Sequence, residues 1–284
     1  MTRNTQTTTT PSTMPPTPPT SPPSTQAQHW LDQLNQALQH RDPAAAAALF
    51  EPQGFWRDLV TFTWNIKTLE GREAIQAMLT ATLAQVQPSN WRLEEEATEN
   101  DGVIEAWICF DTAVAHGRGH LRLRQGQAWT LLTTMVELKD FPEKRNAQRP
   151  RGAEHGINRQ RQTWQEKRQQ EEAQLGYEQQ PYCLVIGGGQ GGIGLGARLR
   201  QLEVPTLIID KLEKPGDAWR RRYKSLCLHD PVWYDHMPYL PFPDHWPVFA
   251  PKDKVGDWLE MYTKVMELNY WGSTECISAH YDEQ

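Results

Sequence analysis

The sequence predicts two domains of different classes, an α+β domain over residues 27–140 and an α/β domain, incomplete at its C-terminal end, over residues 181–284. Helical spacing followed by strand-like alternation indicates the first domain, and a glycine-rich turn between an apolar run and a helix indicates the second. The length of 284 residues exceeds one typical domain and fits two domains with flexible parts.

The N-terminal stretch, residues 1–26, consists mostly of Thr, Pro and Ser and has almost no large apolar side chain. Such a segment buries too little apolar surface to offset the entropy lost on ordering, so we expect a disordered tail. Docking of its prolines to a partner is a less favoured alternative, and the role of the tail stays open.

The first domain combines three predicted helices with three predicted strands. Apolar residues recur at helical spacing in residues 30–38, 44–50 and 71–86. They alternate as in strands in residues 60–66, 104–110 and 129–135. Helices combined with a curved antiparallel sheet predict an α+β cone. In pattern and size the region resembles the SnoaL-like, nuclear-transport-factor-like cone fold.

A cone of this kind can hold an acid–base site in its pocket. Asp58, Asp111, His116 and His120 are the candidate residues here, since carboxylates and imidazoles exchange protons near neutral pH. Polar residues are also normal at strand ends. We therefore favour the simpler interpretation, a domain used for association or for covering a neighbour.

The stretch between the two domains, residues 141–180, is dense in Lys, Arg, Glu and Gln. Both signs of charge alternate, and Trp164 is nearly the only large apolar residue. This pattern predicts a charged, solvated helical linker. Contact of Arg149 or Arg151 with a cofactor phosphate or with the neighbouring domain is the alternative.

The second domain starts with the strongest motif of the chain. The apolar run 182–186 predicts a buried strand and residues 193–202 predict a helix. Between them stand Gly187, Gly188, Gly189, Gln190, Gly191 and Gly192. A second apolar run, residues 206–209, ends in Asp210. Strand, glycine turn, helix, strand and acid follow one another in the order of a Rossmann-type dinucleotide-binding unit.

Each part of this motif has a physical role in holding a dinucleotide. Gly187 allows the tight turn, Gly189 lets a pyrophosphate approach the backbone, and Gly192 lets helix and strand pack closely. Gly191 lies in the same loop, where the start of the helix offers unpaired N–H groups to phosphates. Asp210 can accept hydrogen bonds from the adenosine ribose, and its charge disfavours a 2′-phosphate. FAD or NAD therefore fits this loop better than NADP.

The residues after Asp210 carry a family resemblance. They include the element Gly216-x-x-Trp219-x-x-x-Tyr223, the pair Leu228-His229 and the segment Pro241-Phe242-Pro243. From about residue 181 onward the chain resembles the FAD-binding half of flavin-containing monooxygenases, and above all the bacterial and fungal relatives of plant YUCCA-type enzymes. A cone domain fused in front resembles one branch of that family.

The resemblance implies a cofactor arrangement. FAD would lie extended with its ADP half on the glycine loop, and Gly216 and Trp219 would lie beside its flavin end. Arg220 would balance phosphate or flavin charge, while Tyr223 and His229 would contact FAD or simply pack beneath it. NADPH would reduce the flavin, and one oxygen atom would pass to a nitrogen, sulfur or carbonyl group of a small organic substrate. No catalytic residue and no metal ligand is identified.

The chain departs from that family in one respect. The second glycine loop, which holds NADPH, and the hallmark F-x-G-x-x-x-H are both missing. We therefore expect a fragment of a longer chain or a degraded gene product, with the NADPH site on the missing part and no coupled oxygenation by this chain alone. The alternative is a non-catalytic flavin-binding or assembly module, in which the cone domain mediates association, for example into a homo-oligomer.

Bulk properties narrow the setting. A formal net charge of -6 and a pI near 5.9 do not favour a nucleic-acid partner. No run is long and apolar enough for a transmembrane helix, and the N-terminus lacks the apolar core of a signal peptide. Four cysteines lie far apart without metal-ligand spacing, which indicates free thiols in a reducing, cytoplasmic compartment.

Overall fold

The computed structural model describes residues 21–152, 155–157 and 160–282 of the chain. It divides into two compact units, the first ending at Phe141 and the second beginning at Pro142. Each unit has its own hydrophobic core. None of the helices in the described part of the chain combines the length and apolar composition that a bilayer span requires.

The first unit is an α+β domain. Its elements are α1 (Pro23–Gln39), α2 (Pro43–Ala48), β1 (Phe50–Leu59), β2 (Ile66–Glu70), α3 (Gly71–Val86), β3 (Ser89–Leu93), β4 (Thr98–Asn100), β5 (Val103–Asp111), β6 (Ala115–Arg124) and β7 (Gln127–Leu138). The strands form one sheet in the order β2-β1-β7-β6-β5-β3, with β4 paired to β5. The pairing is antiparallel except between β1 and β7, which run parallel, so the sheet is mixed where an antiparallel one was expected.

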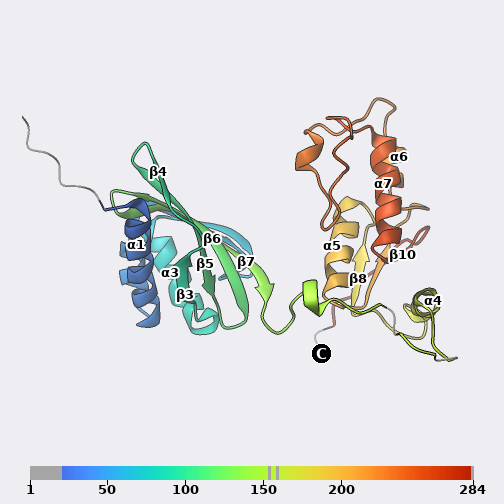
Figure 1. Ribbon diagram of the computed structural model, residues 1–284, viewed down its shortest axis with the longest axis horizontal. Coiled ribbons are helices and arrows are strands. Elements are labelled where there is room, and N and C mark those ends of the chain that lie inside the picture. The colour runs from blue at the N-terminus through green and yellow to red at the C-terminus, as the bar shows by residue number, and fades with distance from the viewer. Residues whose placement is uncertain (1–20, 153–154, 158–159, 283–284) are drawn as a thin grey trace, which may run out of the picture. The chain divides into compact units, whose positions relative to one another are not determined.

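The helices cover one face of this sheet, and the core lies between them (Figure 1). Trp30 of α1 is buried, and its indole donates to the carbonyl oxygen of Leu49 at 3.0 Å. Trp56 stacks on Phe50, and Trp91 stacks on Phe110. Aromatic side chains therefore fill the interior of the first unit.

The prediction for the start of the chain needs correction. The helix α1 begins at Pro23, so the last residues of the predicted tail, 1–26, are helical; Pro favours the first helical turn because it has no N–H to leave unpaired. Residues 1–20 of the tail lie outside the described residues. The boundaries predicted for the helix at residues 71–86 agree with those of α3.

The strand predicted at residues 60–66 is wrong over most of its length. The strand β1 ends at Leu59, and the chain then turns through Val60 and Trp64, both at positive φ. Phe62 is buried while Trp64 is 63% exposed, so the alternating apolar residues do not share one buried face. Asp58 fixes the turn by accepting hydrogen bonds from its backbone, which sequence periodicity does not reveal.

The second unit is an α/β domain with a small parallel sheet. Its elements are the 3₁₀ turn η1 (Asn146–Gln148), α4 (Trp164–Gln174), β8 (Cys183–Ile186), α5 (Gln190–Gln201), β9 (Thr206–Ile209), α6 (Asp217–Arg220), the 3₁₀ turn η2 (Val232–Tyr234), α7 (Lys252–Val265) and β10 (Asn269–Trp271). The strand order is β10-β9-β8, and both pairings are parallel. The helices α5 and α7 pack on one face through a shared apolar core.

The predicted linker, residues 141–180, is a solvated helix over only part of its length. Among its described residues the α-helix is α4, Trp164–Gln174, which starts at a capping box on Thr163 and has no buried residue. Beyond that helix, Leu175 is buried against Leu207 and Ile209 on the second face of the sheet. The segment therefore belongs to the second unit, where Leu175 packs on the sheet and the charged residues Arg168 and Glu171 bond to Asn269 and Arg200.

The strand β8 forms an edge of this sheet. It pairs with β9, and no other described strand joins it. Val185 is buried beneath α5, whereas Leu184 and Ile186, which point to the opposite face, are 48% and 59% exposed. Parallel sheets are normally covered on both faces, so the uncovered side of β8 is unusual for its fold class.

Candidate functional site

The glycine-rich turn lies at the carboxyl end of β8, where it leads into α5. Gly187 has a φ of 106°, a conformation that favours glycine, and its N–H donates to the carbonyl oxygen of Ile209 at 2.9 Å. Gly189 is the N-cap of α5 and has no side chain to bond the first turn. The helix start therefore presents N–H groups and partial positive charge without a side-chain cap.

Space is open beside three of these glycines. A Cβ atom built on Gly187, Gly189 or Gly191 would meet no heavy atom within 4 Å. Open space at an uncapped helix start suits a phosphate group. A Cβ on Gly192, in contrast, would lie closer than 3.0 Å to the carbonyl oxygen of Gly187, which is the close packing expected for this position.

Asp210 follows β9 directly and holds the turn in place. Its Oδ2 accepts a hydrogen bond from the N–H of Gly188 at 2.7 Å, and its Oδ1 accepts one from the N–H of Leu212 at 2.7 Å. Each carboxylate oxygen can accept a further hydrogen bond. The side chain can therefore organise the loop and still accept hydrogen bonds from ribose hydroxyls.

Trp219 of α6 reaches the same loop. Its indole Nε1 donates to Oε1 of Gln190 at 3.0 Å, which links α6 to the first residue of α5. The ring also packs against the apolar core beneath α5 and α7. The structure thus brings Trp219 to the glycine turn through a side chain, Gln190, that the sequence motif did not single out.

Gly216 and Arg220 face helix α7. A Cβ on Gly216 would lie closer than 3.0 Å to the backbone of Gly256, and Gly216 has a φ of 86°, so glycine is needed here for turn and helix contact. Arg220 pairs with Asp257 at 2.9 Å and with Glu260 at 2.6 Å. Both residues therefore make structural contacts with α7, and their contact with the cofactor stays a prediction.

The surroundings of Arg220 explain its charge state. Burial by itself lowers the pKa of Arg220, but hydrogen bonds to Asp257 and Asp217 and the charge of Glu260 outweigh burial and raise the pKa above its ordinary value. Its Nη1 lies 3.0 Å from Oδ1 of Asp217. Three carboxylates thus surround the guanidinium and leave little of its charge for a phosphate.

Among the described residues, no hydrogen bond connects Tyr223 or His229 to the glycine turn or to Asp210. Tyr223 is 59% exposed, and His229 is exposed as well. Two residues that sequence reasoning missed do contact the cluster, Gln190 and Tyr270. The motif assigns no role to Gly188. A glycine at that position could have indicated that a large side chain, here Tyr270, lies close to it.

The four candidates in the first unit do not form one site. Asp58 is fully buried and accepts hydrogen bonds from Phe62, Thr63 and Thr133 at 2.8–2.9 Å. Its side chain points to the helix-covered face of the sheet, while His116 and His120 alternate with buried residues of β6 and point to the other face. Asp58 therefore has a structural role.

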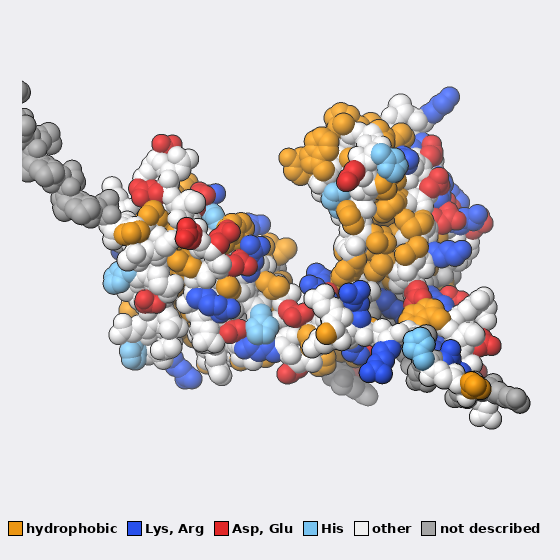
Figure 2. Space-filling view, viewed as in Figure 1, with side chains coloured by type: hydrophobic (Ala, Val, Ile, Leu, Met, Phe, Trp, Pro, Cys, Tyr) orange, Lys and Arg blue, Asp and Glu red, His pale blue; other side chains and the backbone are white. Residues whose placement is uncertain are grey.

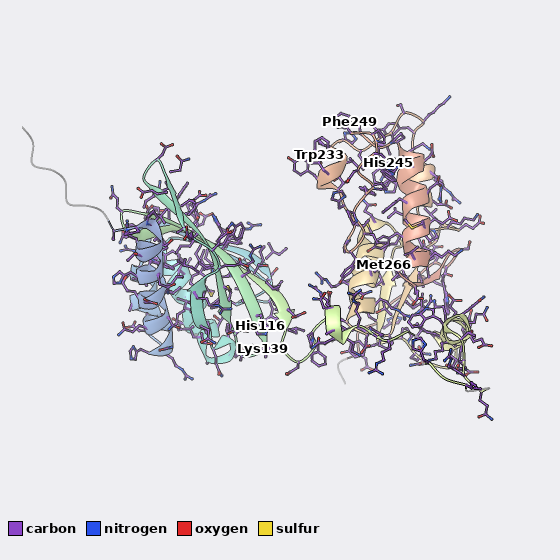
Figure 3. The ribbon with its side chains drawn as sticks, in the orientation of Figure 1. His116, Lys139, Trp233, His245, Phe249 and Met266 are labelled. Carbon is purple, nitrogen blue, oxygen red and sulfur yellow. The ribbon has the colours of Figure 1, made fainter. Side chains whose placement is uncertain are left out.

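Asp111 at the end of β5 pairs with His116 at the start of β6, and His116 lies near Lys139 (Figure 3). Oδ1 of Asp111 lies 2.6 Å from Nδ1 of His116, whose side chain is 55% exposed. A hydrogen bond from Asn90 holds the pKa of Asp111 below its ordinary value. His120 packs on Trp107 instead, and burial lowers its pKa.

Comparison with known proteins identifies relatives. No protein-family model matches the chain. An uncharacterised CzcO-like oxidoreductase of Geobacillus kaustophilus is 35% identical over 101 residues, covering 36% of this chain and 29% of the relative. A probable indole-3-pyruvate monooxygenase, YUCCA9 of Arabidopsis thaliana, is 30% identical over 101 residues, covering 35% and 24%.

Solved structures were compared as well. A flavin-containing monooxygenase of Stenotrophomonas maltophilia aligns at a TM-score of 0.30 with 30% identity, covering 31% of this chain and 27% of that one. The chain spans between a fifth and three-tenths of the length of the curated relatives it matches. Over about a third of its length, 35–36%, the chain is similar to proteins named as CzcO-like oxidoreductases and YUCCA monooxygenases.

Proposed function

We propose that this chain is the FAD-binding part of a flavin-dependent monooxygenase that uses NADPH and oxygenates a small organic substrate at nitrogen, sulfur or carbonyl carbon. The observation that carries the proposal is the open glycine turn at the start of α5, held by the carboxylate of Asp210. The named relatives support the reaction class, because they are oxidoreductases and monooxygenases.

The residues of the turn fit the ADP half of FAD. The N–H groups at the start of α5 would bind the pyrophosphate, and the open space beside Gly187, Gly189 and Gly191 would admit it. Asp210 would accept hydrogen bonds from the ribose, and its negative charge would disfavour the 2′-phosphate of NADPH at this loop. When bound, FAD supplies the acceptance of hydride and the activation of oxygen.

The flavin end is less well defined by this chain. Of the residues expected there, Trp219 contacts the glycine turn, whereas Gly216 and Arg220 contact α7. The proposal for this chain therefore rests on the ADP half. NADPH binding, the substrate and association through the first unit are proposals for the full enzyme.

Substitution of two glycines in α5 tests the site. Gly189 has an extended backbone, with φ at -75° and ψ at -174°, and open space beside it, so Gly189→Val leaves the free protein folded. The valine would stand where the pyrophosphate must lie. We expect the variant to bind FAD at least about tenfold more weakly than the parent, which is about 1.4 kcal/mol.

The matched control is Gly194→Ala, in the same helix. A Cβ there would make ordinary contacts of 3.7–3.8 Å with Pro238 and Met237, away from the turn. Flavin fluorescence titration of all three proteins, with a thermal melt of each in the absence of FAD, measures binding and folding separately. Equal FAD affinity in parent and Gly189→Val would refute the site, and a parent without FAD affinity would favour the non-catalytic assembly module.

A further inference from the structure

Tyr270, the central residue of β10, lies directly against the glycine turn. A Cβ atom on Gly188 would come closer than 3.0 Å to three atoms of the Tyr270 phenol, its Cε2, Cζ and Oη. Gly188 is buried, and its φ lies outside the left-handed region that favours glycine. The need for glycine at this position is therefore spatial, and Tyr270 creates it.

The peptide of Gly188 is also held from a second direction. Its N–H donates to Oδ2 of Asp210 at 2.7 Å. Asp210 is in turn fixed by the N–H of Leu212 at 2.7 Å, and its own N–H donates to the carbonyl oxygen of Trp271, the neighbour of Tyr270. One carboxylate and one aromatic ring, carried by adjacent strands, thus hold the residue between Gly187 and Gly189.

The charge of the phenol is consistent with a packing role. Burial raises the pKa of Tyr270, and the negative charges of Asp210 and Asp217 raise it further, so the ring stays neutral beside a phosphate-binding turn. The ring also packs against the core shared by α5 and α7. Tyr270 therefore rests on the body of the domain and is a rigid support rather than a mobile side chain.

We propose that Tyr270 is a positioning residue for the dinucleotide turn: its ring fixes the Gly188 peptide and thereby sets the affinity of the turn for the ADP part of FAD. This rests on the proposed function. A backbone anion site binds well only when its N–H groups are already aimed at the phosphate, because ordering the turn on binding would reduce the affinity. Tyr270 and Asp210 together supply that order.

The test uses the full chain and four variants, Gly188→Ala, Tyr270→Phe, Tyr270→Ala and Gly188→Ala combined with Tyr270→Ala. The added methyl of Gly188→Ala meets the phenol, so we expect FAD and ADP affinity to fall at least about tenfold. Tyr270→Phe keeps the ring and should bind as the parent does. The double variant has room for the methyl, and we expect it to bind no more weakly than Tyr270→Ala alone.

A second readout does not need the cofactor. In the free protein, hydrogen exchange at the Gly188 amide should accelerate in Tyr270→Ala and stay unchanged in Tyr270→Phe. The Gly187 amide, bonded to Ile209 at 2.9 Å within the strand ladder, is the reference for general loosening. Equal acceleration at both amides, or a double variant that binds more weakly than either single one, would overturn the proposal.

These outcomes are distinguishable from failure of the proposed function. If the parent binds FAD and Gly189→Val does not, the site stands whatever Tyr270 does. If the parent binds no FAD, the exchange rates still decide whether Tyr270 fixes Gly188. Unchanged exchange at Gly188 in Tyr270→Ala would show that Asp210 alone holds the turn.

Discussion

Asp58 gives a sharp test of how the first unit is held together. Its Oδ2 accepts hydrogen bonds from the N–H groups of Phe62 and Thr63 at 2.9 and 2.8 Å and from Thr63 Oγ1 at 2.9 Å. Its Oδ1 accepts a hydrogen bond from Thr133 Oγ1 at 2.8 Å. Thr133 Oγ1 in turn accepts a hydrogen bond from the indole Nε1 of Trp56 at 2.9 Å. The carboxylate thus joins the turn after β1 to the neighbouring strand β7 and to the aromatic core.

The expected loss of stability follows from these bonds. Asp58→Ala leaves buried N–H and hydroxyl groups without an acceptor and should cost about 3–5 kcal/mol, because each unsatisfied buried group costs about 1–3 kcal/mol. Asp58→Asn can still accept the three bonds at one oxygen, although without the charge, so we expect about 1–2 kcal/mol. Asp111→Asn is the control, because its partner His116 is largely exposed and such pairs contribute about 0–1 kcal/mol.

Urea unfolding of residues 21–141, followed by tryptophan fluorescence, measures these differences. The slope of the transition should stay constant while its midpoint moves, which indicates a change in stability at unchanged compactness. An Asp58→Ala protein within about 0.5 kcal/mol of the parent would refute the structural role, since that is the range of ordinary surface substitutions. Asp58 would then have to be reconsidered as a residue of an acid–base site.

Three further predictions concern the separate parts of the molecule. Residues 21–141 alone should melt in one cooperative calorimetric transition, because their core is self-contained, and a gradual melt would contradict this. Arg220→Gln should lower the stability of the second unit by about 1–2 kcal/mol, because it removes the cation that three carboxylates share, without changing FAD affinity in a fluorescence titration. Burial raises the pKa of Glu171, but hydrogen bonds from Arg200 and Asn269 outweigh burial and lower the pKa below its ordinary value of 4.5. The ionised Glu171 therefore stabilises the fold fully at pH values above 4.5, and this contribution is lost as the pH falls through the lowered pKa. Glu171→Gln should therefore flatten the acid limb of a stability–pH curve measured by far-UV circular dichroism.

The sequence predicted the parts of the fold that depend on local pattern. Helix α3 and the strands that contain Ile104 and Leu131 were found because each buries one face at a regular spacing. The strand proposed across Val60 and Trp64 failed because a buried carboxylate, distant contacts and two positive φ values decide that turn. The linker prediction failed in part because Leu175 packs against the sheet and because Arg168 and Glu171 bond to Asn269 and Arg200 of the second unit.

The candidate site divides in the same way. The positions of the glycine turn and Asp210 were predictable because they depend on a strand, a turn and a helix that follow one another in the sequence. Arg220 received a cofactor role from the family resemblance, and its partners on α7, which lie 37 and 40 residues further on, were not predicted. Tyr270 was missed because its contact with Gly188 depends on how β10 lies across the sheet, which no local pattern reveals.

The open side of β8 affects how this chain behaves at high concentration. Its free edge offers unpaired backbone groups, and Cys183–Ile186 carries no charge or proline that would discourage another strand from adding to it. Apolar side chains also gather on the visible face of the second unit, toward the loops that hold Trp233 and Phe249, which are 54% and 52% exposed (Figures 2 and 3). Intermolecular strand addition is second order in protein, whereas folding is first order. Refolding yield should therefore fall as the chain is concentrated, and a lysine in place of Ile186 should restore much of it by placing a charge on the edge that aggregating strands would share.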